Sequence, residues 1–391
     1  MPKVILHCDL NCFFASVEMK YHPELRNVPM AIAGDVNQRN GIILAKNPLA
    51  RAKGIQTTDP IFKAKNKCPN LIIRKPNYEL YEKHSKMVHE LYLQYTDKVE
   101  PFGIDECWLD ISDSIKYFGS TNNIVKDLLR RVKEEIGLTL SIGVSFNKIY
   151  AKLGSDIATE DSYVYINSLN DIKDLPANML VGIGNKTYEH LQTNNIYTIN
   201  DLALCSKEFL LNNYGKQGEY LNLIARGLGY DNVSNYYKEK EKNKSISNCI
   251  TPPNDINDLE TVNILFKKIS ENIASNLRSQ NLYFRTISIT CKNTKLDCVS
   301  FQKKLDENYN TSNIIHNEAL KLFKENITLA NPLRMVGISV TELSDKKIGR
   351  SLSLFTDNKF DDKQEKLEKT IDYIHQLYGD ESILSLTLLN K

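Results

Sequence analysis

The stretch Leu6-His-Cys-Asp-Leu-Asn-Cys-Phe-Phe-Ala-Ser-Val-Glu18 decides how the chain begins to fold. It continues an apolar run over residues 3–8 that predicts a short buried strand. The strand ends at Asp9, and a helix is predicted to begin at Phe13 and to include Met19. The sequence therefore places a carboxylate at the end of a buried strand, directly before a helix.

A second acidic site lies in the stretch Gly103-Ile-Asp-Glu-Cys-Trp-Leu-Asp110. Strands predicted over 98–102 and 107–111 flank a turn that holds Asp105 and Glu106. An acidic pair at this place has two interpretations. It is ordinary turn chemistry, because Asp is common in turns, or it belongs to a site that needs carboxylates.

The elements around these two stretches follow the ferredoxin-like order of strand, helix, strand, strand, helix, strand. In such a sheet the first strand and the hairpin are neighbours, so the three carboxylates converge on one edge. Residues 20–76 interrupt the order as an inserted lobe, with strands at 30–33 and 41–45. The remaining elements of the order are helices at 78–96 and 121–136 and a strand at 139–145, followed by a helix at 147–157.

A short helix in the inserted lobe is marked by its ends. Asn47 is a good N-cap, Pro48 suits the first helical position, and Gly54 suits the C-terminal stop.

Three further segments follow the catalytic part. Residues 166–233 are predicted to be helical, and the charged run 237–244 is a plausible linker. Residues 245–343 alternate strands with helices, and the last forty residues contain one amphipathic segment. The strands are predicted at 286–291 and 334–341, the helices at 258–278 and 313–325, and the apolar face of the amphipathic segment carries Leu367, Ile371, Ile374 and Leu377.

Length and composition indicate an ordinary globular protein of two to four domains, with 391 residues, 41% hydrophobic and 25% charged. No apolar run reaches the roughly 18–20 residues that span a bilayer, and the N-terminus enters a strand with no signal peptide in view. We expect a cytoplasmic protein. The eight cysteines include no Cys-x-x-Cys pair, so we expect reduced, mostly buried thiols.

The net charge of +2 is unevenly distributed. Residues 31–80 contain nine basic and three acidic residues, a net +6, and residues 241–350 carry a net +4. A nearly neutral chain binds nucleic acid when its positive charge is gathered on one face. Charge alone fits a solvated surface equally well.

The convergence of three carboxylates has a chemical consequence. Carboxylates within about 4 Å of one another repel strongly unless cations lie between them. Mg²⁺ prefers oxygen ligands and accepts one or two carboxylates together with substrate phosphates. Two such ions, roughly 3.5–4 Å apart, activate a 3′-hydroxyl and stabilise the leaving pyrophosphate.

Both acidic stretches closely resemble motifs of the Y-family DNA polymerases, and Ser141-Ile-Gly-Val-Ser-Phe-Asn-Lys-Ile-Tyr-Ala-Lys-Leu-Gly-Ser-Asp156 resembles a third. The similarity covers about residues 1–360, and the nearest subgroup is the bacterial DNA polymerase IV type. Three ordered motifs at the family's spacing favour the metal site over turn chemistry.

The resemblance implies an α+β fold of the right-hand polymerase type: a ferredoxin-like palm, small fingers, a helical thumb with a helix-hairpin-helix, and an α/β little finger. It also implies error-prone, template-directed DNA synthesis from dNTPs, without a proofreading domain. The implied boundaries are 1–19 and 77–165 for the palm, 20–76 for the fingers, 166–236 for the thumb, 237–244 for the linker, 245–343 for the little finger, and 344–391 for a C-terminal tail.

The resemblance also implies residue roles. Asp9 and Asp105 would hold both Mg²⁺ ions, Glu106 the catalytic one, and Leu10 would add its backbone carbonyl. Phe14 would be the steric gate against ribonucleotides. The implied nucleotide-binding residues are Cys12, Phe13, Phe14 and Arg51, and the cationic candidates near DNA are Lys148 and Lys152.

The chain departs from the family's pattern at several triphosphate contacts. Ala45 and Pro48 stand where relatives commonly have Thr and Tyr, and Thr159 stands where Lys is frequent. Gly103 replaces a usual Ser. These changes put the dNTP affinity in doubt, and Lys46 is a candidate to compensate.

The DNA-holding residues are predicted less sharply. Gly182 and Gly184 permit a tight turn before a helix, whose exposed N–H groups can bind a phosphate. An ordinary helical turn has the same pattern. In the little finger, the charge fits contact with the DNA backbone. The candidates there are Arg285, Lys303, Lys304 and Arg334.

The segment Ser351-Leu-Ser-Leu-Phe355 resembles the motif by which bacterial polymerases dock on the sliding clamp. Leu352, Leu354 and Phe355 would be the apolar anchors. Ser351 stands where the motif usually has Gln, and a strand end packed on its own domain is the alternative. Besides the clamp, the implied partners are primer-template DNA and dNTPs, with the protein a monomer.

Two rival functions are considered. A nucleotide cyclase shares the palm design but needs no thumb or 245–343 domain. A polymerase-like accessory protein would have lost metal carboxylates, whereas this chain keeps all three. The sequence does not specify the preferred lesion or the fidelity.

Overall fold

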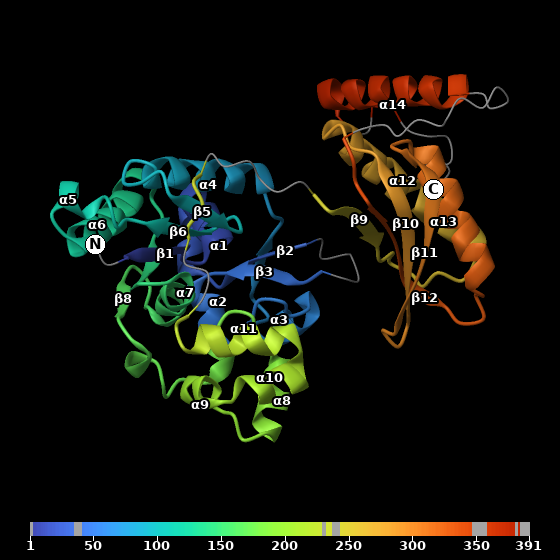
Figure 1. Cartoon of the computed structure of the whole chain (residues 1–391). Helices are drawn as coiled ribbons and strands as arrows, with labels where there is room; N and C mark the ends of the chain where they lie inside the picture. Colours follow the sequence, from blue (N-terminus) through green and yellow to red (C-terminus); the bar gives the residue numbers. More distant parts are fainter. Residues whose placement is uncertain are drawn as a thin grey trace. The chain divides into compact units, whose positions relative to one another are not determined.

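The computed structural model describes residues 3–34, 41–228, 232–236, 243–345, 358–379 and 382–383. The chain divides into two compact units, one formed by Met1–Val36 and Gly41–Glu239, the other by Asn37–Asn40 and Lys240–Lys391 (Figure 1). Each unit is described by itself. Among the described residues no helix is both long and apolar enough to cross a membrane.

A five-stranded sheet forms the centre of the first unit, in the order β5-β6-β1-β7-β8. Four strands of this sheet, β1, β5, β6 and β7, have the predicted ferredoxin-like arrangement. Strand β1 lies between β6 and β7 and is antiparallel to both. The last strand pairs in parallel with β7 and was missed by the sequence analysis. The bounds are β1 Ile5–Leu10, β5 Val99–Phe102, β6 Glu106–Asp110, β7 Leu140–Ser145 and β8 Tyr163–Ile166.

Strand β1 separates two environments, because successive side chains point to opposite faces of a sheet. Leu6, Cys8 and Leu10 belong to the main hydrophobic core, which is built with residues of three helices. The alternate residues His7 and Asp9 meet the helix on the opposite face. The three core helices are α1 Phe13–Tyr21, α4 Tyr78–Tyr92 and α6 Thr121–Arg131, and the opposite helix is α7 Lys148–Ile157.

A close glycine contact lets α7 approach the sheet. A Cβ placed on Gly143 of β7 would lie 1.8 Å from the carbonyl oxygen of Ala151, and one placed on Gly154 would lie 2.8 Å from the Cα of Gly143. No other residue type fits at either position without moving the helix. This contact sets how near the side chains of α7 come to β1.

The inserted lobe has a three-stranded sheet of its own, in the order β3-β2-β4. The predicted capped helix is confirmed: the side chain of Asn47 accepts from the N–H of Ala50, and Pro48 is the first helical residue. Gly54 follows with a φ of 76°. The bounds are β2 Met30–Ala33, β3 Ile43–Lys46, β4 Ile72–Arg74, α2 Pro48–Ala52 and α3 Ile61–Lys67.

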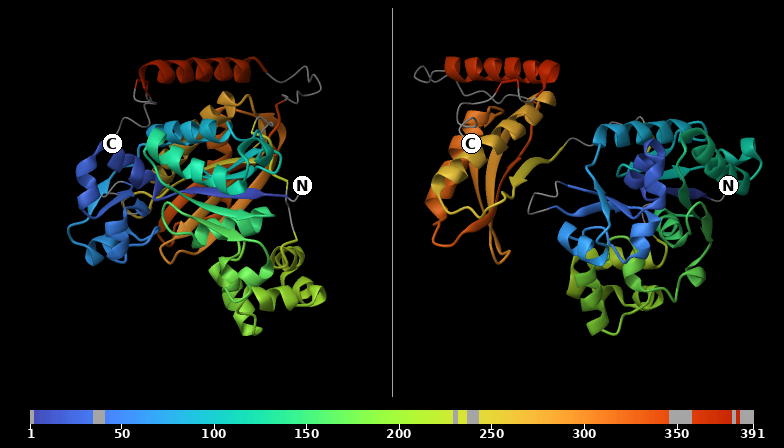
Figure 2. Two further views of the ribbon diagram at one scale, coloured as in Figure 1. Left: turned by 90° about the vertical axis from the view of Figure 1, so that its left-hand side faces the viewer. Right: turned by 180° about the vertical axis from the view of Figure 1, so that it is seen from behind.

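The predicted helical segment after the sheet is confirmed. It forms a cluster of short helices (Figure 2), and its hydrophobic core also includes Tyr150 and Leu153 of α7 and Ile166 of β8. The bounds are α8 Asn185–Thr193, α9 Ile199–Leu204, α10 Lys207–Tyr214 and α11 Lys216–Ala225, preceded by single turns at Leu169–Asp171 and Ala177–Met179.

The second unit is built on a four-stranded antiparallel sheet in the order β11-β10-β12-β9. The predicted helices and strands are present, and strands β9 and β11 were missed. One hydrophobic core joins the sheet to α12 and α13. The bounds are β9 Ser245–Ile250, β10 Phe284–Asn293, β11 Cys298–Tyr309, β12 Leu333–Thr341, α12 Leu259–Ser279, α13 Ser312–Asn326 and α14 Asn358–Tyr378.

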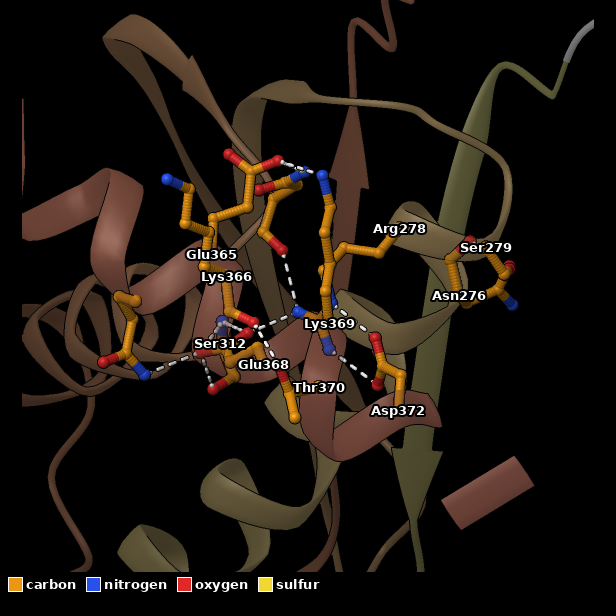
Figure 3. Close-up of polar contacts among 12 residues, drawn as sticks. Asn276, Arg278, Ser279, Ser312, Glu365, Lys366, Glu368, Lys369, Thr370 and Asp372 are labelled. Carbon is orange, nitrogen blue, oxygen red and sulfur yellow. Dashed lines mark hydrogen bonds and ion pairs between the residues drawn. The ribbon is translucent and has the colours of Figure 1, made fainter. Parts of the chain in front are cut away.

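Helix α14 contacts the second unit through acidic side chains rather than through its apolar face (Figure 3). Arg278, near the end of α12, pairs with Glu368 and with Asp372, the latter at 2.6 Å. Glu368 also accepts from the N–H of Ser312, at the start of α13. Of the predicted apolar face, Leu367 and Leu377 are each 54% exposed and Ile371 and Ile374 are half-buried, so this face is less buried than the one that carries Glu368.

All eight cysteines are unpaired, as predicted. Four are buried, whereas Cys249 and Cys298 are exposed, so the expectation of burial holds only in part. Most of the predicted linker lies outside the described residues, and the predicted domain boundaries remain predictions.

Candidate active site

The three predicted carboxylates lie at adjoining ends of β1 and β6. Asp9 is the register partner of Glu106 across the two strands. The N–H of Leu10 donates to the carbonyl oxygen of Asp105 at 3.1 Å, which ties the hairpin turn to the end of β1. The side chains of Asp9 and Glu106 are 27% and 21% exposed, so the site is shielded but open to solvent.

Lys152 of α7 lies among these carboxylates. Its ammonium is 2.9 Å from Oε2 of Glu106, 3.8 Å from Oδ2 of Asp9 and 3.0 Å from Asp156. Its side chain is only 10% exposed. The sequence analysis expected Lys152 near DNA, and the structure places it inside the acidic cluster. The close glycine contact of α7 with β7 brings it there.

The electrostatics of the cluster favour bound cations. Burial, followed by the charge of Glu106, raises the pKa of Asp9 to about 7. The same two causes raise the pKa of Asp105. Burial also acts on Glu106, but hydrogen bonding from His7 and Lys152 outweighs it and lowers the pKa of Glu106. One lysine therefore leaves two of the three carboxylates undercompensated.

The donor set fits Mg²⁺, which takes hard oxygen ligands. In the described part of the chain no group of three or more His, Cys, Asp or Glu side chains is arranged to hold a metal ion by itself. In phosphoryl transfer, Mg²⁺ is held by one or two carboxylates together with substrate phosphates and water. The residues that would hold it are Asp9, Asp105 and Glu106, with the carbonyl of Leu10.

Phe13 and Phe14, which are adjacent in the sequence, lie in different surroundings. Phe13 is 3% exposed and belongs to the main core. The ring of Phe14 is half-buried and stacks on Tyr81 of α4, with ring centres 4.2 Å apart and planes within 14°. Tyr81 in turn donates to Glu18 at 2.9 Å. The ring of Tyr81 therefore packs against one face of the Phe14 ring.

Two predicted nucleotide-binding residues come together beside the gate. Nη2 of Arg51 lies 3.1 Å from the sulfur of Cys12, and Cys12 has a left-handed backbone with φ 50°. Lys46, the candidate to compensate for Ala45 and Pro48, has its ammonium on Thr57 Oγ1 at 3.0 Å.

The other residues of the first unit that are predicted to contact DNA are one lysine that is already ion-paired and two glycines in a turn. Lys148 is held by Glu100 at 2.6 Å and lies over the ring of Trp108 at 4.6 Å. Gly182 has a φ of 95°. Gly184 is the N-cap of α8, and because glycine has no side chain, no N-cap side chain occupies the N–H groups of the first turn. The predicted helix before this turn is only the single turn Ala177–Met179.

In the second unit, three of the four cationic candidates have partners within the unit. Lys303 pairs with Glu318 at 2.6 Å and Lys304 with Glu342 at 2.9 Å, while Arg285 donates to backbone carbonyls. Leu352, Leu354 and Phe355, predicted to bind the clamp, lie outside the described residues.

Sequence analysis missed the residues that support the carboxylates from behind. His7 lies 3.3 Å from Glu106 and 2.7 Å from Ser155 of α7. The spacing of His7, two residues before Asp9, could have shown that both point to one face of the sheet. Its partner on α7 could not be found that way, because it depends on the depth of helix packing.

Comparisons with known proteins agree with this geometry. Residues 8–156 match the impB/mucB/samB family, and residues 243–354 match the C-terminal domain of that family. The chain is 40% identical over 387 residues to DNA polymerase IV of Acetivibrio thermocellus, covering 98% of this chain and 96% of the relative. It is 31% identical to DNA polymerase IV of Clostridium kluyveri, covering 100% and 99%.

A solved structure is also similar in fold. A chimera of the Y-family DNA polymerases Dbh and Dpo4 superposes with a TM-score of 0.76, at 22% identity, over 87% of this chain and 98% of the chimera.

Proposed function

The chain belongs to the impB/mucB/samB family of Y-family DNA polymerases, and from this premise we propose that it performs translesion DNA synthesis at Asp9, Asp105 and Glu106. It is a DNA-directed DNA polymerase of the polymerase IV type. The observation that supports the site is the register of Asp9 with Glu106, beside a turn that carries Asp105. Primer-template DNA and dNTPs are the substrates.

The reaction is phosphoryl transfer. The oxygen of the primer 3′-hydroxyl forms a bond to the α-phosphorus of the dNTP, the bond to the β-phosphate oxygen breaks, and pyrophosphate leaves with that electron pair. The hydroxyl proton passes to solvent. Two Mg²⁺ ions, when bound, stabilise the charge on the attacking and leaving oxygens. The carboxylates hold these ions and position both reactants.

Lys152 has a separate role in this proposal. Its ammonium balances part of the carboxylate charge before substrates arrive, since it lies within 3.8 Å of both Asp9 and Glu106. Asp156 holds the same ammonium at 3.0 Å, which fixes its position within the acidic cluster. Lys152 therefore keeps the acidic cluster from repelling the DNA phosphates.

Phe14 excludes the 2′-hydroxyl of a ribonucleotide. Its ring is supported by Tyr81, so it does not yield when a sugar presses on it. Arg51 would touch the triphosphate, and its contact with Cys12 places it at the start of α1. The thumb turn at Gly182 and Gly184 would hold a DNA phosphate.

The other partners follow from the family. We expect the segment 351–355 to dock on the sliding clamp, and we expect a monomeric, cytoplasmic enzyme.

One experiment tests the site. Wild type, Asp105→Ala and Glu106→Ala are assayed for primer extension with Mg²⁺ and single dNTPs, on undamaged and damaged templates. Both variants should lose extension and keep DNA affinity, because metal ligation is lost while phosphate contacts remain. EDTA should abolish wild-type extension and added Mg²⁺ should restore it. Extension at near wild-type rate in either variant would refute the assignment.

A further inference from the structure

His7 is buried in the wall of the active site and belongs to none of the roles given so far. Its side chain is 0% exposed, in β1 between Trp108 of β6 and Gly143 of β7. The ring of Trp108 contacts it edge-on at 5.2 Å between centres. The ring of Trp108 therefore packs against one side of the imidazole.

Both nitrogens of His7 face functional neighbours. Nδ1 is 2.7 Å from the hydroxyl oxygen of Ser155. Nε2 is 3.3 Å from Oε2 of Glu106. Nε2 is buried and completes no hydrogen bond as placed in the described structure, whereas Oε2 already has the ammonium of Lys152 at 2.9 Å. Leaving a buried polar atom without a partner is costly, so the Nε2 contact is one that the working enzyme must complete.

The hydroxyl of Ser155 decides where the histidine proton lies, because it has one hydrogen and two acceptors within reach. If it donates to the carbonyl oxygen of Lys152, at 2.8 Å, a neutral His7 must carry its one proton on Nδ1. Two lone pairs, on Nε2 and on Glu106, then face each other. If Ser155 donates to Nδ1, the proton lies on Nε2 and points at Glu106.

The second arrangement is favoured. The carbonyl of Lys152 lies inside α7, where a backbone N–H four residues later already serves it, so it loses little. The carboxylate of Glu106 gains a donor, and a small turn of the carboxylate closes the 3.3 Å contact.

We propose that His7 is a positioning residue that donates from Nε2 to Glu106 and fixes its carboxylate for the catalytic metal. This rests on the proposed function, in which Glu106 is a metal ligand. His7 and Lys152 both lie at Oε2, which leaves Oε1 for the ion. Groups that hydrogen-bond a ligating side chain set its orientation, and their loss typically costs about 10–100-fold in metal affinity or activity.

The close contact between Gly143 and Gly154 supports this arrangement. Because the Gly143–Gly154 contact lowers α7 onto the sheet, Ser155 reaches His7 from one side while Lys152 reaches Glu106. One helix thus fixes the proton position on His7 and neutralises the carboxylate that His7 orients.

The test compares His7→Phe, His7→Gln and Ser155→Ala with the wild type. Mn²⁺ binding is measured by electron paramagnetic resonance, with DNA that has a dideoxy-terminated primer and with the matching dNTP, so that no chemistry occurs. The Mg²⁺ concentration for half-maximal extension, the DNA affinity and the melting temperature are measured alongside. His84→Phe is the matched control, since His84 is also buried in the first unit, at 1% exposure.

His7→Phe should weaken Mn²⁺ binding and raise the half-saturating Mg²⁺ concentration by about 10–100-fold, with DNA affinity unchanged. His7→Gln should recover part of both, because its amide can donate toward Glu106. Ser155→Ala should lose less Mn²⁺ affinity than His7→Phe. His84→Phe should bind Mn²⁺ as the wild type does.

Unchanged Mn²⁺ affinity in folded His7→Phe overturns the inference. If that variant does not fold, unchanged Mn²⁺ affinity in folded Ser155→Ala overturns it, because His7→Gln keeps a donor toward Glu106. Failure of the proposed function looks different: the wild type would not extend primers, or Asp105→Ala would still do so.

Discussion

At the scale of single residues, the two adjacent phenylalanines offer a sharp contrast. Phe14→Ala should let the enzyme incorporate ribonucleotides, because the supported ring no longer meets the 2′-hydroxyl. A displacement of the reacting atoms by about 1 Å costs roughly 100-fold in rate. A 100-fold preference for dNTPs over rNTPs corresponds to about 2.7 kcal/mol of transition-state free energy. The measurement is the ratio of dNTP to rNTP incorporation efficiency in the wild type and the variant.

Phe13→Ala is the control for that measurement. Phe13 is 3% exposed in the core, so its truncation should cost about 3–5 kcal/mol of stability and leave the sugar preference unchanged in whatever folds. An unchanged ratio in active Phe14→Ala would remove Phe14 from the gate role.

Much of the residue-level site could be predicted from the sequence, because the strand and hairpin are local patterns. Asp9 follows an apolar run and Asp105 sits in a turn, and both features are visible over a few residues. The ammonium of Lys152 could not be placed that way. Its 2.9 Å contact with Glu106 depends on how deeply a helix packs, which is a long-range property.

At the scale of elements, glycine residues determine how closely α7 packs on the sheet. Gly143→Ala should destabilise the first unit and reduce extension, because the new Cβ would lie 1.8 Å from a backbone oxygen of α7 and 2.4 Å from the Ser155 nitrogen. Backbone cannot yield as a flexible side chain does, so α7 must move away. Overpacking typically costs about 1–3 kcal/mol, and this case should lie at or above the upper end.

Thermal unfolding and Mg²⁺-dependent extension measure this effect. Gly34→Ala is the control, since a Cβ there would meet only the Cα of Gly41, at the ordinary contact distance of 3.9 Å. A Gly143→Ala protein as stable and as active as the wild type would mean that α7 does not need this approach.

Helix α14 shows where an element-level prediction has a limit. The sequence correctly predicts a helical periodicity with Leu367 and Leu377 on one face. Periodicity does not say which face is buried. Here Arg278 decides it, because its ion pairs with Glu368 and Asp372 turn the acidic side inward. Such a pairing joins residues about ninety positions apart and has no local pattern.

Arg278→Ala should therefore release α14 from the second unit. Removing one partner of a buried ion pair costs about 3–5 kcal/mol, because the other charge stays buried. Limited proteolysis within 358–379 measures the release. Lys369→Ala is the matched control, since Lys369 is 53% exposed and pairs with Glu365 on the same helix. Equal protection of the helix in both variants would contradict the role of Arg278.

At the scale of the whole molecule, a net charge of +2 conceals two basic stretches, one mostly in the first unit and one in the second. Residues 31–80 carry a net +6 and residues 241–350 a net +4. Contact with the phosphate backbone makes binding fall with salt. Both units can thus contribute to DNA affinity without a high overall charge.

The C-terminal tail carries both the candidate clamp anchors and helix α14, and a test of clamp binding must keep the two apart. Deleting 351–391 would remove the candidate anchors together with α14. It would leave Arg278, 8% exposed, without its carboxylates, at a cost of about 3–5 kcal/mol. A lost response to the clamp would then be confused with a damaged second unit.

The double substitution Leu354→Ala and Phe355→Ala avoids this, because it keeps the partners of Arg278. It should abolish stimulation by a sliding clamp and leave distributive primer extension unchanged, since truncated apolar anchors no longer fill a pocket. Ser351→Gln should act in the opposite direction, because it restores the residue that the motif usually has. Primer extension with and without the clamp measures both. Full stimulation of the double variant, with no gain in Ser351→Gln, would mean that this segment does not dock.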